Sequence, residues 1–419
     1  MSNGFFVHNL GCKVNRVESD TICAQLMTRG AHLVTRDAAD VIIINTCTVT
    51  SEADAKTRKA IRQALAAEQH PMVVVTGCST AINADTLSSL GLRVVIEPDR
   101  STALERAFTL LRRKQDPDNT LGFHAIPYVT RSGESFNTRV GIKIQDGCDE
   151  RCSFCIVSTA RGPARSLAVR DILAEVELAV HAGARELIFT GVNLGSYQSD
   201  SGFNLTELLH LILEKYSGVR IRLSSIEPLD VGDDLLALIA SSQGRICAHL
   251  HMPLQSGSDR ILKSMNRPYT SSQYEALVQK AFYLLPRLAI TTDVIVGFPD
   301  ESDEDFEQTL DMCRRVGFSR IHVFKFSKRP GTAASDMPGQ IPAPIKAIRS
   351  KQLIELAHQL ATHDAARRID MTEQVLVERA GRGTSESYHP VELSSSHKPG
   401  ELIPLTFIAN KEATLIEKR

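Results

Sequence analysis

Three cysteines within eight residues, directly after a predicted strand, constrain this chain more than any other feature. Cys148, Cys152 and Cys155 have the spacing C-x3-C-x2-C. Three thiolates this close can hold one face of a cubane iron–sulfur cluster and leave the fourth iron open to a substrate. A zinc site usually needs a fourth protein ligand, and the nearest candidate, His181, is distant in sequence. A zinc site and three buried structural cysteines remain as alternatives.

Strand and helix patterns alternate around and after this triplet, over residues 138–330. The strand candidates are residues 139–145, 186–190, 219–224, 246–252, 289–296 and 320–326. Six such units are too few for the usual closed barrel of eight strands. The pattern therefore predicts an α/β fold with a central partial (β/α)6 barrel, and the loops after its strands should carry the chemistry.

Residues 1–115 predict a separate domain built on a parallel α/β sheet. Apolar runs at 40–46, 72–77 and 94–96 are separated by helix patterns, which is typical of a sheet covered on both faces. Ligands of such sheets lie beyond the C-terminal ends of the strands. Single cysteines usually fill cores, but three follow strand candidates, and we expect them to share one edge of the sheet: Cys12, Cys47 and Cys78.

The remaining segments predict a linker and a small all-β domain. Residues 116–137 are polar and rich in turn residues, so we expect a linker there. The barrel domain then spans 138–368 and ends in a basic amphipathic helix over 344–368. Apolar and polar residues alternate through 369–419, which predicts short strands. Cys23, Cys247 and Cys313 are interpreted as packing residues.

Charge and hydropathy limit the partners of the chain. Lys plus Arg is 48 and Asp plus Glu is 49, so the formal net charge is −1. Any nucleic-acid site must therefore be a local patch. No apolar run approaches the roughly 18 residues of a membrane span, and the first residues do not resemble a signal peptide. We expect a cytoplasmic protein without a membrane partner, in which the nine cysteines stay reduced.

The cysteine triplet, with Phe154 before its last member, resembles the radical S-adenosylmethionine (SAM) motif. The resemblance implies that Cys148, Cys152 and Cys155 bind a [4Fe–4S] cluster whose open iron chelates the amino and carboxylate groups of SAM. An electron from that cluster would cleave SAM to a 5′-deoxyadenosyl radical, which removes hydrogen from an unreactive C–H bond. The cofactors would supply the radical, and the protein would position the reactants and exclude water.

The segments around Cys12, Cys47 and Cys78 resemble the N-terminal domain of the methylthiotransferases. That resemblance implies a second [4Fe–4S] cluster, which carries the sulfur to be inserted, and it assigns no acid–base catalytic side chain. The strand-end segments of the barrel match those of the family that contact SAM. The residues implied as SAM contacts are Gly191, Asn193, Ser225, Glu227, Gln255 and Gly297. One departure is Asp300, which stands where the family usually has glycine in GFPGE.

The first cysteine segment, Gly11–Asn15, reads GCKVN and is similar to one type within the family. That type converts N6-threonylcarbamoyladenosine next to the tRNA anticodon to its 2-methylthio derivative. Residues 369–419 occupy the place of the family's RNA-gripping TRAM domain but lack a dense basic stripe. We therefore expect phosphate contacts from the barrel domain: Arg161, Arg165, Lys263, Arg267, Lys325, Lys328 and Arg329.

The implied partners are a tRNA anticodon loop and a low-potential electron donor, and the chain is expected to be a monomer or weak dimer. The N-terminal domain should lie over the open side of the barrel, because both clusters must reach one base. Alternative functions are methylthiolation of isopentenyladenosine tRNA or of a ribosomal protein, an iron–sulfur redox sensor or carrier, and a module that only binds tRNA.

Overall fold

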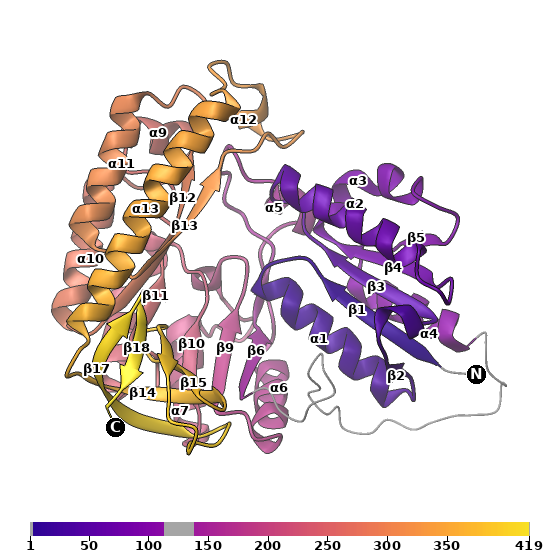
Figure 1. Cartoon of the computed structure of the whole chain (residues 1–419), viewed down its shortest axis with the longest axis horizontal. Coiled ribbons are helices and arrows are strands. Elements are labelled where there is room, and N and C mark those ends of the chain that lie inside the picture. Colours follow the sequence, from indigo (N-terminus) through magenta and orange to yellow (C-terminus); the bar gives the residue numbers. More distant parts are fainter. Residues whose placement is uncertain (1–2, 113–137, 419) are drawn as a thin grey trace.

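The computed structural model describes residues 3–112 and 138–418. The predicted linker at 116–137 lies outside the described residues. An N-terminal sheet unit, a central barrel and a small C-terminal barrel follow one another along the chain (Figure 1). This is the α/β architecture predicted from the sequence. In the described part of the chain, no helix is both long enough and apolar enough to cross a membrane.

The N-terminal unit is a parallel sheet of order β2-β1-β3-β4-β5. Its central strands are apolar on both faces, because Ile43 and Val74 pack on one side and Ile42 and Val73 on the other. Helices cover both faces, as such strands require. The elements are β1 (Gly4–Asn9), α1 (Lys13–Thr28), β2 (His32–Leu33), η1 (Arg36–Ala38), β3 (Val41–Thr46), α2 (Ser51–Leu65), β4 (Met72–Gly77), α3 (Cys78–Ser88), β5 (Val94–Ile96) and α4 (Arg100–Arg112).

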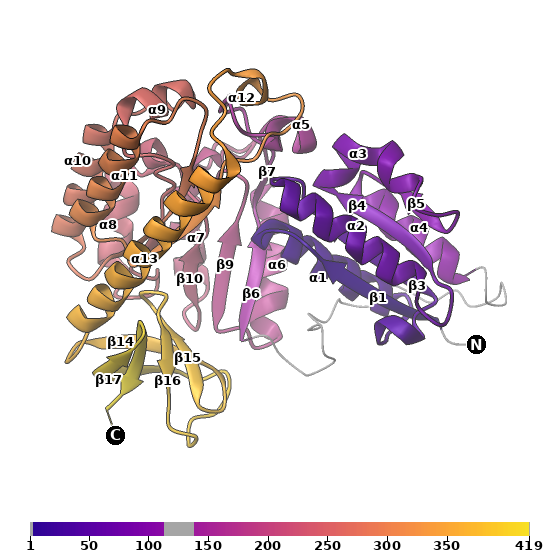
Figure 2. The ribbon, with the colours of Figure 1, turned by 45° about the horizontal axis from the view of Figure 1, so that its top comes forward.

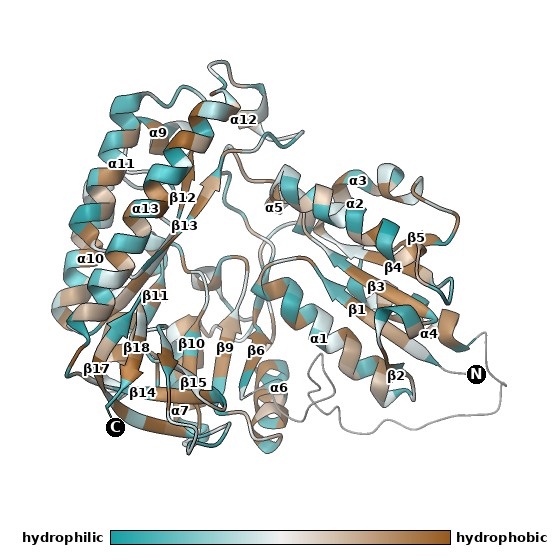
Figure 3. Ribbon diagram, viewed as in Figure 1, coloured by the Kyte–Doolittle hydropathy of each residue, from teal (hydrophilic) through white to brown (hydrophobic). Residues whose placement is uncertain are grey.

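The central barrel has parallel strands in chain order, and helices cover its outside. Its strands are β6 (Arg139–Lys143), β9 (Glu186–Thr190), β10 (Arg220–Leu223), β11 (His249–His251), β12 (Ala289–Val296) and β13 (Arg320–Lys325). Among the described residues no pairing joins β6 to β13, so the barrel is open on one side. Figure 3 shows hydrophobic residues along β12 and β13 and hydrophilic stretches on α11 and α13.

Helices and short elements complete the barrel unit. They are β7 (Gln145–Asp146), α5 (Val157–Arg161), β8 (Arg165–Ser166), α6 (Val169–His181), η2 (Leu194–Ser196), α7 (Leu205–Lys215), η3 (Pro228–Asp230), α8 (Asp233–Ser241), α9 (Asp259–Ser264), α10 (Ser271–Leu284), α11 (Asp303–Val316), α12 (Ala333–Asp336) and α13 (Ala343–Arg367). The strand expected over 246–252 is shorter in the structure. The amide of His249 donates to the carbonyl of Cys247 at 2.7 Å, and this local turn interrupts the pairing.

The C-terminal unit is a small barrel that closes in the order β14-β15-β16-β18-β17. Arg220 and Arg222, at the start of β10, donate to backbone carbonyls of this unit, among them those of Gln374 and Ser385. It therefore covers the N-terminal ends of the central strands (Figure 1). Its strands are β14 (Thr372–Arg379), β15 (Arg382–Ser385), β16 (Pro390–Glu392), β17 (Leu402–Lys411) and β18 (Thr414–Glu417).

The N-terminal unit lies beside the open side of the barrel and contacts both of its borders (Figure 2). At the first border, Lys143 of β6 donates to Glu18 of α1 at 3.0 Å. At the other, the hydroxyls of Ser51 and Ser327 are 2.8 Å apart, and Ser327 follows β13. The unit thus bridges the opening between β6 and β13.

Candidate functional site

Cys148, Cys152 and Cys155 lie in one tightly folded loop between β7 and α5. The amide of Cys148 donates to the carbonyl of Gly162 at 3.1 Å, and the amide of Cys155 donates to the carbonyl of Cys152 at 3.1 Å. Gly147 adopts a φ of +72°, and a Cβ there would lie 1.9 Å from the carbonyl oxygen of Pro163. Only glycine permits this close approach. The loop therefore presents its thiols as one group.

These thiols are buried enough to remain protonated when no metal is bound. Burial raises the pKa of Cys148 to about 11 and that of Cys155 to about 12, and the neighbouring thiols add to the shift. Burial also raises the pKa of Cys152, although the guanidinium of Arg267 opposes it. Metal binding would displace the protons and give thiolate ligands.

The second trio comes from the C-terminal ends of neighbouring strands, as parallel topology requires. Cys12 follows β1 and caps α1, Cys47 follows β3, and Cys78 follows β4 as the first residue of α3. Burial raises the pKa of Cys47 to about 11, and the charges of Cys78 and Cys12 act in the same direction. The sheet therefore gathers three cysteines that are 31 or more residues apart in sequence.

The donor sets fit iron–sulfur clusters better than single metal ions. All six cysteines are free. Among the described residues, the sulfur atoms of neither cysteine trio all lie within 4.8 Å of one another. A single zinc ion with bonds of about 2.3 Å to sulfur would require closer sulfurs. In a four-iron cluster each thiolate binds a different iron, so the sulfurs stand further apart.

The two trios face a common boundary between the N-terminal unit and the barrel. Arg161, at the end of the helix after Cys155, donates to Oδ1 of Asn15 at 3.1 Å. The same oxygen accepts from the Cys12 thiol at 3.2 Å. Arg161 also hydrogen-bonds Cys78 and lowers its pKa, although burial is the larger effect and raises it. One guanidinium thus links the loop of one trio to two members of the other.

A second guanidinium lies on the barrel trio. Arg267 donates to Sγ of Cys152 at 3.0 Å and pairs with the carboxylate of Glu227. Burial raises the pKa of Glu227, and Arg267 opposes that effect. A cation beside a cluster thiolate stabilises its negative charge.

The residues expected to contact SAM lie at the C-terminal ends of β9 to β12, on the same side of the barrel as Cys148–Cys155. In this structure the Asn193 side chain contacts Gly195 and Asp230. Gly191 packs against Gln145, whose Oε1 accepts the amide of Asn193 at 3.0 Å. The others are Ser225, Glu227, Gln255 and Gly297, which follow β10, β11 and β12. Their contact with SAM stays a prediction.

Three of the cations expected to contact RNA have another role in the structure. Arg161, Arg267 and Arg329 are buried and paired with carboxylates, so they do not face solvent. Arg329, for example, joins the barrel to Asp54 of α2 at 2.6 Å. The position of an arginine or lysine in the sequence does not show whether it forms a buried ion pair or faces solvent. The expected cations that remain exposed are Arg165, Lys263, Lys325 and Lys328.

The sequence interpretation missed a cluster inside the barrel. The carboxylate of Asp293 lies 3.3 Å from Nε2 of His251 and 3.1 Å from Nδ1 of His322. The two imidazoles hold the pKa of this carboxyl well below its usual range, against the effect of burial. The three residues lie on adjacent strands β11, β12 and β13, and strand register alone could have indicated the cluster.

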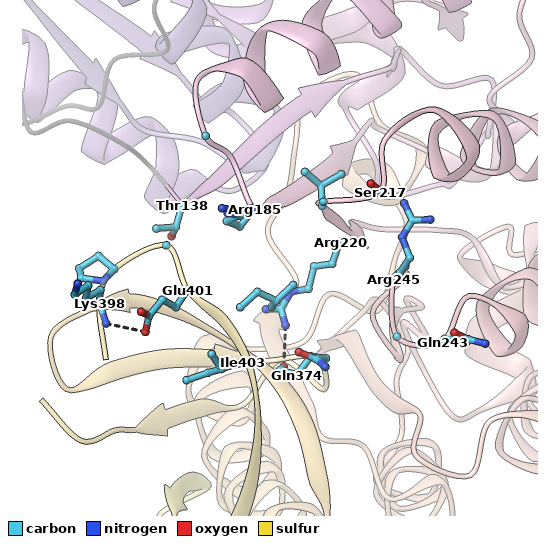
Figure 4. A pocket seen from close by; sticks show the side chains of 17 residues that line it. Thr138, Arg185, Ser217, Arg220, Gln243, Arg245, Gln374, Lys398, Glu401 and Ile403 are labelled. Atoms are coloured by element: carbon cyan, nitrogen blue, oxygen red, sulfur yellow. Dashed lines mark hydrogen bonds between the residues drawn. The ribbon is translucent and has the colours of Figure 1, made fainter. Parts of the chain in front are cut away.

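A separate cavity of about 950 Å³ lies at the other end of the barrel. Figure 4 shows Arg220 hydrogen-bonded to Gln374, with Arg185 and Lys398 also lining the space. These residues precede or begin their strands, whereas the cysteines follow strand ends. None of the six cysteines lines this cavity.

Comparison with known proteins settles the family. The Radical SAM superfamily matches residues 142–313, and the Uncharacterized protein family UPF0004 matches residues 4–96. The threonylcarbamoyladenosine tRNA methylthiotransferase MtaB of Bacillus subtilis is 36% identical over 389 residues, which cover 90% of this chain and 86% of that protein. MtaB of Thermotoga maritima is 35% identical over 373 residues, covering 89% and 86%. The chain belongs to the radical SAM methylthiotransferases.

Methylthiotransferases of another type are almost as similar. The tRNA-2-methylthio-N(6)-dimethylallyladenosine synthase of Carboxydothermus hydrogenoformans is 35% identical over 373 residues, covering 85% of this chain and 84% of that protein. Among solved structures, the radical SAM methyltransferase TsrM of Kitasatospora setae matches with a TM-score of 0.57 and 16% identity, covering 80% of this chain and 77% of that one. That likeness concerns the fold alone. Radical SAM methylthiotransferases use SAM and two [4Fe–4S] clusters.

Proposed function

We propose that this methylthiotransferase converts N6-threonylcarbamoyladenosine next to the tRNA anticodon to its 2-methylthio derivative. One observation carries the proposal: two trios of free cysteines from separate units lie at one boundary, where Arg161, at the end of the helix after Cys155, donates to Asn15 beside Cys12 and hydrogen-bonds Cys78. The relatives named MtaB, at 35–37% identity over about nine-tenths of the chain, support the threonylcarbamoyl substrate.

Each part of the chain has a definite task in this proposal. Cys148, Cys152 and Cys155 would hold the cluster that binds SAM, and the trio at the sheet edge would hold the cluster that donates sulfur. Bound clusters and SAM supply the radical chemistry and the sulfur atom. Arg267 stabilises the charge of the Cys152 thiolate, and the N-terminal unit covers the open side of the barrel, which keeps water from the reacting base.

Other parts of the proposal follow from the reaction. The target adenine is splayed out of its loop, because a stacked base does not reach an enclosed site. A low-potential one-electron donor must reduce the barrel cluster. We also propose a cytoplasmic monomer or weak dimer with domains at 1–115, 138–368 and 369–419, joined by a linker at 116–137.

The first test is anaerobic reconstitution with iron counting. Two clusters give about eight irons per chain, and one gives about four. Replacing any one of the six cysteines by alanine should lower the count, whereas Cys313→Ala should not, because Cys313 is buried in the barrel core. A count of four in the wild-type protein would contradict the assignment of two clusters.

The second test identifies the nucleoside. Mass spectrometry of tRNA from a strain that lacks this protein should show loss of the 2-methylthio derivative and accumulation of N6-threonylcarbamoyladenosine. Loss of a methylthiolated isopentenyladenosine would instead assign the chain to the other tRNA-modifying type. If no methylthio-nucleoside is missing from the tRNA of that strain, the result contradicts a tRNA substrate.

A further inference from the structure

Four cations from two units surround one tyrosine of the third unit, inside the barrel. Tyr388 lies in the turn between β15 and β16 and adopts a φ of +71°, a conformation that is uncommon for residues other than glycine. Its ring centre is 5.2 Å from Nζ of Lys13, 5.4 Å from Cζ of Arg139, 4.7 Å from Cζ of Arg222 and 5.5 Å from Cζ of Arg320. The N-terminal unit, the central barrel and the C-terminal barrel therefore meet at this point.

The protein neutralises only part of this positive charge. Arg139 pairs with Glu186 at 2.8 Å and with Glu378 at 2.7 Å, and Arg222 pairs with Glu186 at 3.0 Å. Within residues 3–112 and 138–418, no carboxylate lies within 4 Å of the charged group of Lys13 or Arg320. The nearby cations also act on the phenol. Burial alone would raise the pKa of Tyr388, but the nearby cations, Lys13 foremost, lower it below its ordinary value.

Of the two cations that have no carboxylate partner among the described residues, Lys13 lines a cavity, whereas Arg320 is exposed but is not part of its lining. Lys13 and Arg320 are exposed to solvent, whereas Arg222 is fully buried. Lys13, Arg139 and Tyr388 line a cavity of about 400 Å³ between α1 and the first strands of the barrel. Two carboxylates also line this cavity, but Asp20 pairs with Arg16 and Glu378 pairs with Arg139, which leaves the charge of Lys13 without a carboxylate partner there. An accessible cavity with one such cation and a phenol hydroxyl is suited to a small anion.

The position of this cavity relates it to the reacting base. Lys13 is the first residue of α1 and follows Cys12 directly, so one wall of the cavity is next to a member of the cysteine trio at the sheet edge. We propose that Lys13 and Arg320, above Tyr388, form a subsite for the free carboxylate of the threonyl group on the substrate nucleoside. This inference rests on the proposed function, and it assigns the selectivity for the acidic nucleoside to named residues.

An RNA backbone phosphate has similar chemistry, but the location favours the carboxylate. The cations meet over one ring at the junction of all three units, and Lys13 directly follows Cys12, a member of the trio at the sheet edge. The relatives named for dimethylallyladenosine act on a base with an apolar group at the same nitrogen. Such a group makes no ionic contact with two unpaired cations. The subsite thus distinguishes the two tRNA substrates by charge.

The test compares two nucleosides that differ in one charge. Anticodon stem-loops carrying N6-threonylcarbamoyladenosine, or its carboxamide analogue, are titrated against the reconstituted enzyme by fluorescence anisotropy. We expect the wild-type enzyme to bind the acid about tenfold more tightly than the amide, as one charge-assisted contact allows. Lys13→Gln and Arg320→Gln should each reduce that preference, and Lys13→Arg should retain it.

Arg16→Gln is the matched control, because Arg16 lines the same cavity but pairs with Asp20 at 2.8 Å. It should keep the preference, and each variant must show the iron content of the wild type. Equal binding of acid and amide by the wild type would overturn the proposal. An equal loss of affinity for both stem-loops in Lys13→Gln would assign Lys13 to a phosphate instead.

Methylthiolation assays on the same stem-loops distinguish a wrong subsite from a wrong substrate. If the wild type methylthiolates the acid stem-loop but shows no preference over the amide, the subsite is wrong and the proposed function stands. If the wild type methylthiolates only isopentenyladenosine stem-loops, the proposed function is wrong and the subsite falls with it.

Discussion

The guanidinium of Arg161 donates to Oδ1 of Asn15 at 3.1 Å, across the boundary between the barrel and the N-terminal unit. Arg161 ends the helix that follows Cys155, and Asn15 accepts from the thiol of Cys12. The ends of the two cysteine loops are therefore held together by protein contacts alone. This contact and its neighbours thus join the two cysteine-bearing units without any metal.

Arg161→Gln should weaken both the fold and the sheet-edge cluster. Arg161 is buried and donates to Glu18 at 3.0 Å and to Asp146 at 2.8 Å. Glu18 would keep Arg100 and Lys143 as partners, and Asp146 would keep Lys143. The loss of the buried hydrogen bonds should therefore cost about 1–3 kcal/mol. We expect the free energy of unfolding of the metal-free protein to fall by that amount, measured by urea denaturation. Iron per chain should fall from about eight toward about four.

Arg165→Gln is the matched control for Arg161. Its side chain is 56% exposed and lies 3.5 Å from the same Asp146. Exposed pairs contribute about 0–1 kcal/mol, so stability and iron content should stay close to those of the wild type. If Arg161→Gln behaves like Arg165→Gln, the linking role of Arg161 is wrong.

Arg267→Gln should lower the reduction potential of the barrel cluster. Arg267 donates to Sγ of Cys152 at 3.0 Å, and reduction adds negative charge to the cluster. A positive donor to sulfur stabilises the reduced form, so its loss makes reduction harder. A redox titration followed by electron paramagnetic resonance measures the shift at full iron content. An unchanged potential would show that Arg267 serves only to hold Glu227.

The sequence predicts most of the fold because the strands are short, apolar and regularly spaced. The strands at 186–190 and 289–296 have the predicted bounds, and the helix over 271–284 does as well. The convergence of Cys12, Cys47 and Cys78 also follows from topology, since parallel strands end at one edge. Secondary structure and strand order need only local patterns and the rules of parallel sheets.

Contacts between units do not follow from such patterns. Arg329 looks like an exposed cation in the sequence, but it lies 2.6 Å from Asp54, more than 270 residues away. Tyr388 is one aromatic residue in a turn of the last domain, and nothing in its neighbourhood indicates the cations of the other two units. Side chains that act between units depend on how those units pack, which no single segment encodes.

Gly339→Ala should destabilise the loop that contains the family departure at Asp300. Gly339 has a φ of +68°, and a Cβ there would lie 1.6 Å from Oδ1 of Asp300. The left-handed conformation alone costs about 1–2 kcal/mol for alanine, and the clash adds to it. Thermal unfolding should show a smaller loss for Gly339→Ala combined with Asp300→Gly than for Gly339→Ala alone. Equal losses would show that Asp300 moves away without cost.

Asp364→Asn should destabilise the protein strongly near neutral pH and much less in acid. The carboxylate accepts from His389 at 2.8 Å and from Arg368 at 3.0 Å, and these contacts outweigh burial and hold its pKa well below the ordinary value. The contribution to stability is therefore complete above about pH 4, where the unfolded carboxyl is ionised, and declines as the pH falls further. Urea unfolding from pH 7 to pH 3 should show the gap between wild type and variant, about 3 kcal/mol at neutral pH, narrow below pH 4. Asp200→Asn, at an exposed site, should show no such gap, and a gap that widens in acid would contradict the sign of the shift.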